Sequence, residues 1–337
     1  MVGALKEISS MFKQEVMPST GIMSQVGDKV KQWSTALALP TLGLVLFLAL
    51  WNVVAKNIDT SLGQFPGPVA VWEQTNNLVD EHYAEVAKAE AFYERQEKRN
   101  EARLAKDPSY EPKIRPFTGA PTFFQQIWTS LFTVATGFFM ASIIAVPLGI
   151  LCGLSKSAYS AINPLIQLFK PVSPLAWLPL VTMIVSAVYV SDDPMFSKSF
   201  ITSAVTVSLC CLWPTLINTA VGVSSIDKDL INVSKVLRLN SVDHIIKIVM
   251  PSSIPMIFTG LRLSLGIGWM VLIAAEMLAQ NPGLGKFVWD EFQNGSSASL
   301  ARIMVAVLAI GVIGFLLDRL MLSVQKYVTW DKTANLR

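Results

Sequence analysis

The chain has 337 residues, of which 52% are hydrophobic and 15% charged, and its mean hydropathy is +0.47. Soluble domains carry about 25% charged residues, so this composition indicates a protein largely buried in a membrane. The net charge of +3 favours no nucleic-acid partner, and Cys152, Cys210 and Cys211 fit neither a disulfide framework nor a zinc site.

Six apolar segments are long enough to cross a bilayer, whose hydrocarbon core needs about 20 helical residues. The third is short alone but is extended by the preceding "INPLIQLFKPVS". Prolines and glycines inside these spans are tolerated because neighbouring helices satisfy the backbone groups that they leave unpaired. Gly149 and Gly153 form a GxxxG motif that allows close helix contact. The predicted bundle therefore consists of spans at 35–55, 127–154, 174–190, 199–223, 257–279 and 301–322.

A long polar segment, 56–126, separates the first two spans. Its centre is rich in helix formers and lacks Gly and Pro, and Glu94 precedes Lys98 by four residues, which favours an ion pair on a helix. We expect a polar helix outside the membrane, which either contacts a partner or is a solvated insertion. The proline-marked "DPSYEPKIRPFTGAP" then returns the chain as an irregular segment.

Lysine and arginine gather in the segment 1–34, in the loop 224–254 and in the tail 329–337. Positive charge in short loops marks the cytoplasmic side, whereas long loops cross the membrane regardless of charge. We therefore expect both termini in the cytoplasm and the segment 56–126 outside it. The core would comprise residues 127–328.

The loop 224–254 is too long and too patterned for a simple connection. Leu230, Val233 and Leu237 share one helical face, while Lys228 and Lys235 fall elsewhere. This pattern predicts a short amphipathic helix on the inner face of the bundle, which the following "MPSSIP" separates from the next helix.

This loop resembles the cytoplasmic "EAA" loop of ABC importer permeases, in which E-A-A-R-x-L-G precedes two prolines and a glycine. Here the acidic residue and the first glycine are replaced by Asn232 and Arg238. "FPGPVAVWE", "NPLIQLFKPVSPLAWLPLVTMIV", "TGLRLSLGIGWMVLIAAEML" and "NPGLGKFVWDEF" resemble stretches of the nitrate, sulfonate, taurine and bicarbonate permeases, most of all the nitrate type.

The resemblance implies an all-α membrane protein with six transmembrane helices, the type I ABC importer permease fold and a helical extracytoplasmic insertion. In that family the short helix couples the membrane bundle to a separate ATPase. The residues of this chain that match the coupling loop are Asp227, Leu230, Asn232, Val233, Ser234, Lys235, Leu237, Arg238, Pro251, Pro255 and Gly260.

The resemblance also implies partners: ABC ATPase subunits, a second permease copy forming a homodimer, and an extracytoplasmic substrate-binding protein. The sequence contains no GxxxxGK[ST] phosphate-binding loop, so ATP and Mg are expected on the ATPase, with no catalytic residue, metal or cofactor in this chain. His82 and His244 lie far apart and are expected in solvent. The implied location is a bacterial inner membrane.

Polar groups inside spans are costly and are therefore candidates for a translocation path. Arg262 could instead be an interface anchor, Lys170 a charge at the cytoplasmic edge and Trp269 a packing residue, while Glu276 could reach the outer surface. The candidates are Lys170, Thr182, Thr206, Asn218, Arg262, Ser264, Trp269 and Glu276.

The most favoured function is import of a small inorganic oxyanion, nitrate first, with sulfonate, taurine or bicarbonate as alternative cargoes. A secondary transporter without an ATPase would be expected to contain inverted repeats, which the sequence does not show. A membrane-embedded enzyme would need clustered His, Asp or Glu at membrane depth, which these spans lack.

Overall fold

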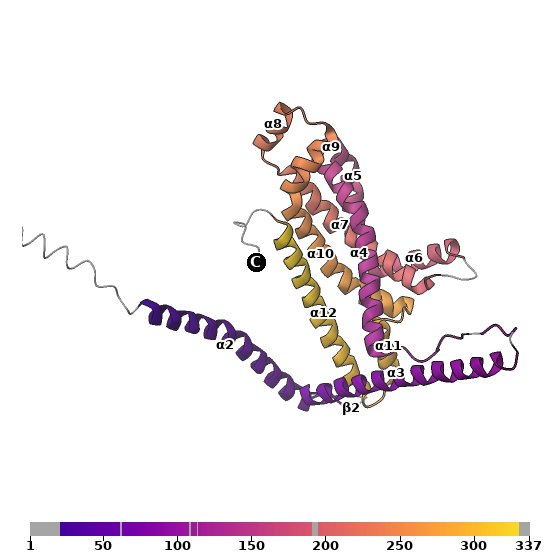
Figure 1. Cartoon of the computed structure of the whole chain (residues 1–337). Coiled ribbons are helices and arrows are strands. Elements are labelled where there is room, and N and C mark those ends of the chain that lie inside the picture. Colours follow the sequence, from indigo (N-terminus) through magenta and orange to yellow (C-terminus); the bar gives the residue numbers. More distant parts are fainter. Residues whose placement is uncertain (1–20, 61–62, 108, 113, 191–194, 330–337) are drawn as a thin grey trace, which may run out of the picture. The chain divides into compact units, whose positions relative to one another are not determined.

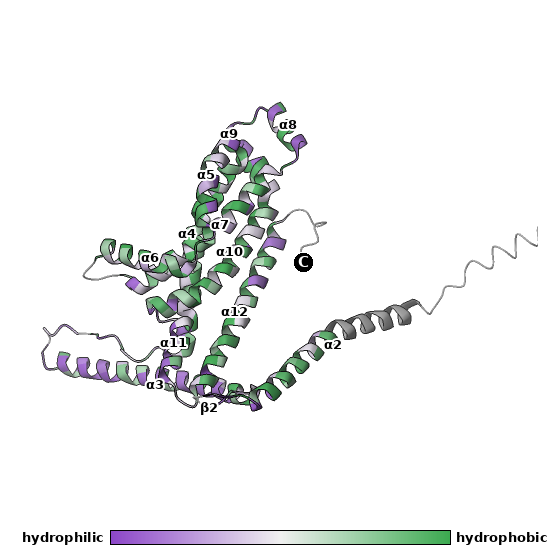
Figure 2. Cartoon of the chain, turned by 180° about the vertical axis from the view of Figure 1, so that it is seen from behind, coloured by the Kyte–Doolittle hydropathy of each residue, from purple (hydrophilic) through white to green (hydrophobic). Residues whose placement is uncertain are grey.

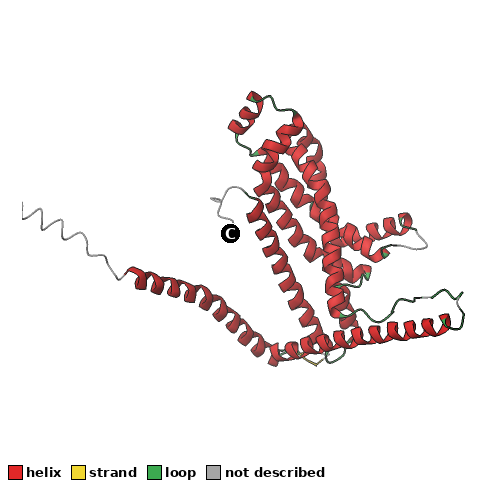
Figure 3. Ribbon diagram, in the orientation of Figure 1, coloured by secondary structure: helices red, strands yellow, loops and turns green. Residues whose placement is uncertain are grey.

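The computed structural model describes residues 21–60, 63–107, 109–112, 114–190 and 195–329, with side chains from residue 38 onward. The predicted N-terminal segment 1–34 and tail 329–337 lie mostly outside the described residues. The described chain is almost entirely helical (Figure 3). It divides into two compact units, residues 1–68 and 69–337.

The first unit holds α2 (Gly21–Lys56), whose apolar part Ala38–Lys56 coincides with the first predicted span. A two-stranded antiparallel hairpin follows, in which β1 (Asp59–Thr60) pairs with β2 (Gly63–Gln64). The Trp51 indole N–H donates to the Pro66 carbonyl oxygen over 3.1 Å, so the segment after the hairpin returns to the end of α2.

The helices of the second unit are α3 (Pro68–Leu104), α4 (Phe123–Leu154), α5 (Lys156–Phe169), α6 (Pro174–Val188), α7 (Lys198–Ser224), α8 (Lys228–Val236), α9 (Ser241–His244), the π-helical turn η1 (Ile245–Val249), α10 (Met250–Ala279), α11 (Leu284–Asn294) and α12 (Ser299–Val328). The long helices α4, α7, α10 and α12 are mostly apolar, whereas α3 and α8 are largely polar (Figure 2).

Five helices in the described part of the chain are long and apolar enough to cross a membrane. The third predicted span is instead a pair, α5 and α6, bent by 100°. Pro171 and Pro174 account for the break, because each lacks a backbone N–H and restricts the residue before it. Counting this broken pair as one span gives the six that the sequence predicts.

The expectation that "MPSSIP" separates two helices is wrong. The helix runs without interruption from Ser241 to Ala279, because the η1 turn precedes Pro251. There the Met250 N–H donates to the carbonyl oxygen of Ile245, five residues back. This wider turn accommodates a proline that ordinary α-helical spacing would set against a carbonyl.

Small residues bring α4 and α10 close to α7, which lies between them. Along α4, a Cβ on Gly149 would lie 2.6 Å from the Thr219 Cβ atom and 2.8 Å from the Leu216 oxygen, and one on Gly137 would lie 2.6 Å from the Ala204 oxygen. The predicted GxxxG contact is therefore present, and it is made with α7. Such residues drive helix association where lipid supplies no hydrophobic gain.

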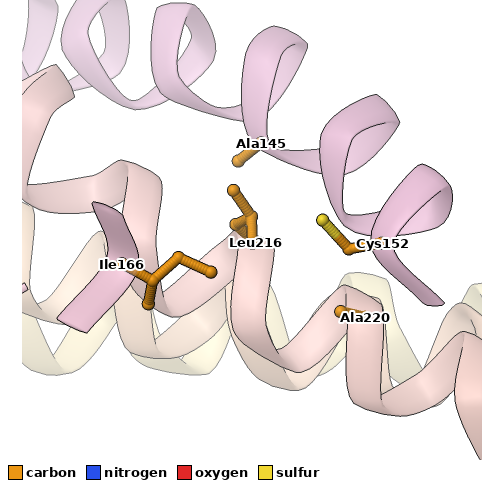
Figure 4. Packing of buried hydrophobic residues seen from close by; sticks show 5 residues of the cluster. All are labelled: Ala145, Cys152, Ile166, Leu216 and Ala220. Atoms are coloured by element: carbon orange, nitrogen blue, oxygen red, sulfur yellow. The ribbon is translucent and has the colours of Figure 1, made fainter. Parts of the chain in front are cut away.

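The α5 helix is held to this core by apolar packing. Ile166 of α5 lies against Leu216 and Ala220 of α7 and Ala145 and Cys152 of α4, all nearly inaccessible to solvent (Figure 4). The other half of the broken pair, α6, also packs on the bundle: it contacts α7 and α10 and buries Leu178, Val181 and Val185.

The predicted polar helix is α3, and the irregular segment after it runs back along it (Figure 1). Gln96 fixes this return segment, donating to the Arg115 carbonyl oxygen over 3.0 Å and accepting from the Arg115 N–H over 2.7 Å. The predicted pair forms between Lys98 and Glu94 at 2.6 Å, and the lysine lowers the pKa of that exposed carboxyl group.

Replacing Gly149 by alanine should destabilise the fold by about 1–3 kcal/mol, because the added methyl meets the backbone and a branched side chain of α7. The matched control is Gly311→Ala on α12, where nothing lies within 4 Å of the new atom. Thermal unfolding of both variants in detergent checks this. Equal melting temperatures would contradict the tight α4–α7 contact.

Candidate functional site: the α8 surface and the buried polar groups

The α8 helix forms within the loop that the sequence singles out, and its start is capped. The Asp227 carboxylate accepts a hydrogen bond from the Asp229 N–H over 2.9 Å. A carboxylate here satisfies an otherwise unpaired N–H and suits the positive end of the helix dipole.

The end of α8 is closed by two backbone hydrogen bonds. The Leu239 N–H donates to the Ser234 oxygen and the Arg238 N–H to the Lys235 oxygen, each over 3.1 Å. This is the Schellman arrangement, and it requires a left-handed residue at Arg238, whose φ is +48°. Arg238 stands where the EAA loop carries glycine, so the left-handed conformation gives that glycine its physical reason.

The predicted apolar stripe of α8 is open to solvent. Leu230, Val233 and Leu237 are 41%, 47% and 62% exposed. Ser234, four residues after Leu230 and at the edge of this stripe, is buried, and its hydroxyl lies 2.7 Å from His244 Nδ1 at the start of the long helix. The expectation that His244 lies free in solvent is therefore wrong, because its side chain contacts Ser234 and holds α8 in place. Asn232 and Lys235 complete the matched segment on the exposed sides of α8.

The other matched residues lie in α10. Pro251 stands in its first turn and Pro255 inside it, where the Gln325 amide of α12 donates to the Pro255 oxygen over 3.2 Å. Gly260 is buried against α7, since a Cβ there would lie 2.8 Å from Asn218 Cβ. These three residues support the packing of α10 and do not belong to the exposed α8 surface.

Three candidate path residues on α7 and α10 form hydrogen bonds within the protein. The Ser264 hydroxyl donates to the Cys211 oxygen over 2.6 Å and lies 2.6 Å from Thr215 Oγ1. Buried Thr206 donates to the Thr202 oxygen, and half-buried Asn218 donates to the Pro214 oxygen, each within α7. Only Ser264 thus links α10 to α7, whereas Thr206 and Asn218 bond the backbone of their own helix and Asn218 stays partly exposed.

Arg262 has a partner that the sequence did not suggest. Asp318 of α12 receives a bidentate ion pair from its guanidinium, in which Nη2 lies 2.8 Å from Oδ2. Both side chains remain about one-third exposed. A bidentate contact is the favoured geometry between a guanidinium and a carboxylate. The sequence pattern does not predict this ion pair, because the two residues lie 56 positions apart.

The remaining intramembrane candidates separate by exposure. Trp269 is buried, and its indole N–H donates to the Ile310 oxygen of α12 over 3.0 Å. It therefore packs against α12, which agrees with the alternative that it is a packing residue. Lys170, at the end of α5, and Thr182, in α6, are exposed. The sequence places Lys170 where a helix breaks, and the structure puts it at that 100° bend.

The expectation that Glu276 could reach the outer surface is wrong, because its exposed fraction is 0%. Ser130 of α4 donates to its carboxyl group, lying 2.9 and 2.8 Å from the two oxygens, and the Gly285 N–H of α11 donates over 3.0 Å. Glu276 therefore joins three helices.

The sequence reasoning also missed Arg302, at the start of α12. Its guanidinium lies 2.6 and 2.9 Å from the two carboxylate oxygens of Glu81 in α3, and 2.6 Å from Glu291 in α11. The ion pair between Arg302 and Glu81 ties α3 to α12. His82 of α3 adds a contact with the start of α4, since its Nδ1 lies 2.8 Å from the Thr122 hydroxyl. The groups lining a cavity of about 440 Å³ there include Lys88 with Glu85 and Lys286 with Asp290, each an ion pair.

No group of three or more His, Cys, Asp or Glu side chains that could hold a metal occurs among the described residues. The capped α8 helix, with its exposed apolar side chains, lies at the end of the bundle opposite α11 (Figure 1).

Replacing Arg238 by glycine should slow amide exchange at the end of α8, because glycine adopts the left-handed conformation without the strain of roughly 1 kcal/mol that other residues carry. Arg238→Val at the same position should speed exchange. Hydrogen–deuterium exchange over residues 234–239 measures both. The same exchange in both variants would show that the left-handed turn does not limit this helix end.

Comparison with known proteins agrees with this architecture. The family described as "binding-protein-dependent transport system inner membrane component" matches residues 145–329. A chain of the inward-facing MetNI methionine ABC transporter aligns with a TM-score of 0.52 at 13% identity, covering 61% of this chain and 96% of that one, which shows the type I ABC importer permease fold.

Curated relatives are similar over most of their length. The nitrate import permease NrtB of Synechocystis sp. is 30% identical over 300 residues, which are 88% of this chain and 90% of that protein. The bicarbonate transport permease CmpB of Synechococcus elongatus is 31% identical over 305 residues, 89% and 93% of the two chains. The chain belongs to the inner-membrane permease family of binding-protein-dependent ABC transporters.

Proposed function

We propose that this chain is the transmembrane permease subunit of an ATP-driven importer for a small inorganic oxyanion, with nitrate as the first candidate cargo. The observation that carries the proposal is α8, a helix capped at both ends that turns its apolar side chains outward. An exposed amphipathic helix of this kind is suited to the groove of a partner protein.

The partner that fits α8 is a separate ABC ATPase subunit, which would bind ATP and Mg. The 337-residue sequence contains no phosphate-binding loop of its own. Because Ser234 binds His244 at the start of the 39-residue helix Ser241–Ala279, movement of α8 would be passed directly into the bundle. A secondary transporter would leave this exposed helix without a partner.

Two observations support the choice of cargo class. The relatives named above carry nitrate in one case and bicarbonate in the other, with nearly equal identity to this chain. Nitrate and bicarbonate are both small, planar, singly charged oxyanions, so weak hydrogen-bond donors would serve either. Bicarbonate is therefore the second candidate, ahead of sulfonates such as taurine.

Two copies of the chain would enclose the path, with an extracytoplasmic binding protein delivering the anion. Exposure selects among the path candidates, since a side chain buried within one copy cannot line a passage between two. Lys170, Thr182, Asn218 and Arg262 retain exposure, whereas Thr206, Ser264, Trp269 and Glu276 do not. The first four are the proposed path residues.

Replacing Val233 and Leu237 by aspartate should abolish ATP hydrolysis stimulated by the loaded binding protein in the reconstituted complex. A charge on each exposed apolar position would be buried without a partner on docking, which is costly. The control is Ile114→Asp, an apolar position on the segment that runs back along α3 and still more exposed than Val233 and Leu237. Stimulation that survives in the double variant would refute the docking role of α8.

A second experiment tests the orientation in a bacterial inner membrane. A cysteine at Lys228 of α8 should react with a membrane-impermeant maleimide only after the cells are opened, whereas a cysteine at Lys98 of α3 should react in cells whose outer barrier alone is permeabilised. Buried Cys152 and Cys211 should react little. The reverse labelling pattern would place α8 outside the cytoplasm.

A further inference from the structure

We propose that Glu276 is a positioning residue that makes α11 move together with α10 at the outer end of the bundle. This inference rests on the proposed importer function, because it assigns Glu276 a role in passing movement from the inner to the outer side. Glu276 stands in the last turn of α10, and α11 begins eight residues later.

The carboxyl group of Glu276 caps the start of α11. The Gly285 N–H in the first turn of α11 donates to Oε2 over 3.0 Å. The Ser130 hydroxyl of α4 accepts from the Leu284 N–H over 2.9 Å and donates to the same carboxyl group. Two backbone donors that the helix leaves unpaired are thus satisfied, one of them through Ser130.

The glycines of "NPGLGKF" allow this close approach. A Cβ on Gly283 would overlap the Glu276 carboxyl group, and one on Gly285 would overlap the Ile273 backbone oxygen and lie 2.9 Å from Glu276 Cβ. In the sequence this stretch stands out only by its resemblance to the nitrate-type permeases. In the structure its glycines admit a side chain of the same protein.

The Glu276 contact completes a connection through the whole bundle. The helix Ser241–Ala279 is held to α8 at His244 and to α11 at Glu276. Beyond α11, Glu291 pairs with Arg302, which also binds Glu81 of α3. A displacement of α8 therefore has a continuous route to α11 and to the polar helix α3.

The test compares Glu276→Gln with the wild type in the complete transporter, reconstituted with its ATPase and binding protein and using nitrate as probe. A glutamine cannot carry the negative charge that suits the start of α11, and its NH₂ group, a donor, replaces one of the two carboxyl oxygens that lie 2.9 and 2.8 Å from the Ser130 hydroxyl. We expect exchange at the first amides of α11 to rise about fivefold or more, the effect of losing a helix cap. The ratio of stimulated to basal ATP hydrolysis should fall toward one.

Asp290→Asn is the control, since Asp290 is a carboxylate on α11 itself that is half exposed and pairs only with Lys286 among the described residues. It should leave exchange and stimulation at wild-type values. If Glu276→Gln fails to accumulate in the membrane, Ser130→Ala removes the bridging hydroxyl and should give the same two effects.

The proposal would be overturned if Glu276→Gln raised amide exchange at the start of α11 but left the stimulation of ATP hydrolysis at its wild-type value. Unchanged amide exchange in this variant would also overturn it. The exchange measurement does not depend on the cargo. A wild-type complex that nitrate-loaded binding protein fails to stimulate would therefore count against the proposed function alone.

Discussion

The fold depends on the close approach of three helix backbones. In lipid there is no hydrophobic driving force between apolar helices, so their association must come from close packing and internal hydrogen bonds. On one side of α7, Gly137, Gly149 and Gly153 of α4 admit its backbone and branched side chains. On the other, Gly260 and Gly268 of α10 admit α7, with hydrogen bonds at Ser264 between them.

The second organising feature is the uninterrupted helix Ser241–Ala279. Its π-helical turn admits Pro251 without a break, so the element remains continuous from the loop bearing α8 to Glu276. A helix with a fixed partner at each end can carry movement across the thickness of a membrane. The proposed coupling therefore needs no chain of small side-chain rearrangements, only the movement of one helix and what is hydrogen-bonded to it.

The sequence was most informative where periodicity and charge asymmetry carry the signal. It predicted the six apolar segments, the polar helix α3 and the amphipathic α8. It could not predict partners that lie far apart along the chain, such as Asp318 for Arg262 or Glu81 for Arg302. It also misjudged three local features. Glu276 reads as a charge near a helix end but is buried by α4 and α11, and Pro251 reads as a helix stop but follows a π turn. His244 reads as a solvated residue but contacts Ser234.

The central claim is that this chain moves solute only when a separate ATPase acts on α8. Uptake of labelled nitrate into vesicles holding the chain and its binding protein, measured with and without the ATPase subunits and ATP, tests it most directly. The account predicts uptake solely in the vesicles that contain both ATPase and ATP. Uptake by the permease alone, driven by an ion or nitrate gradient, would contradict it.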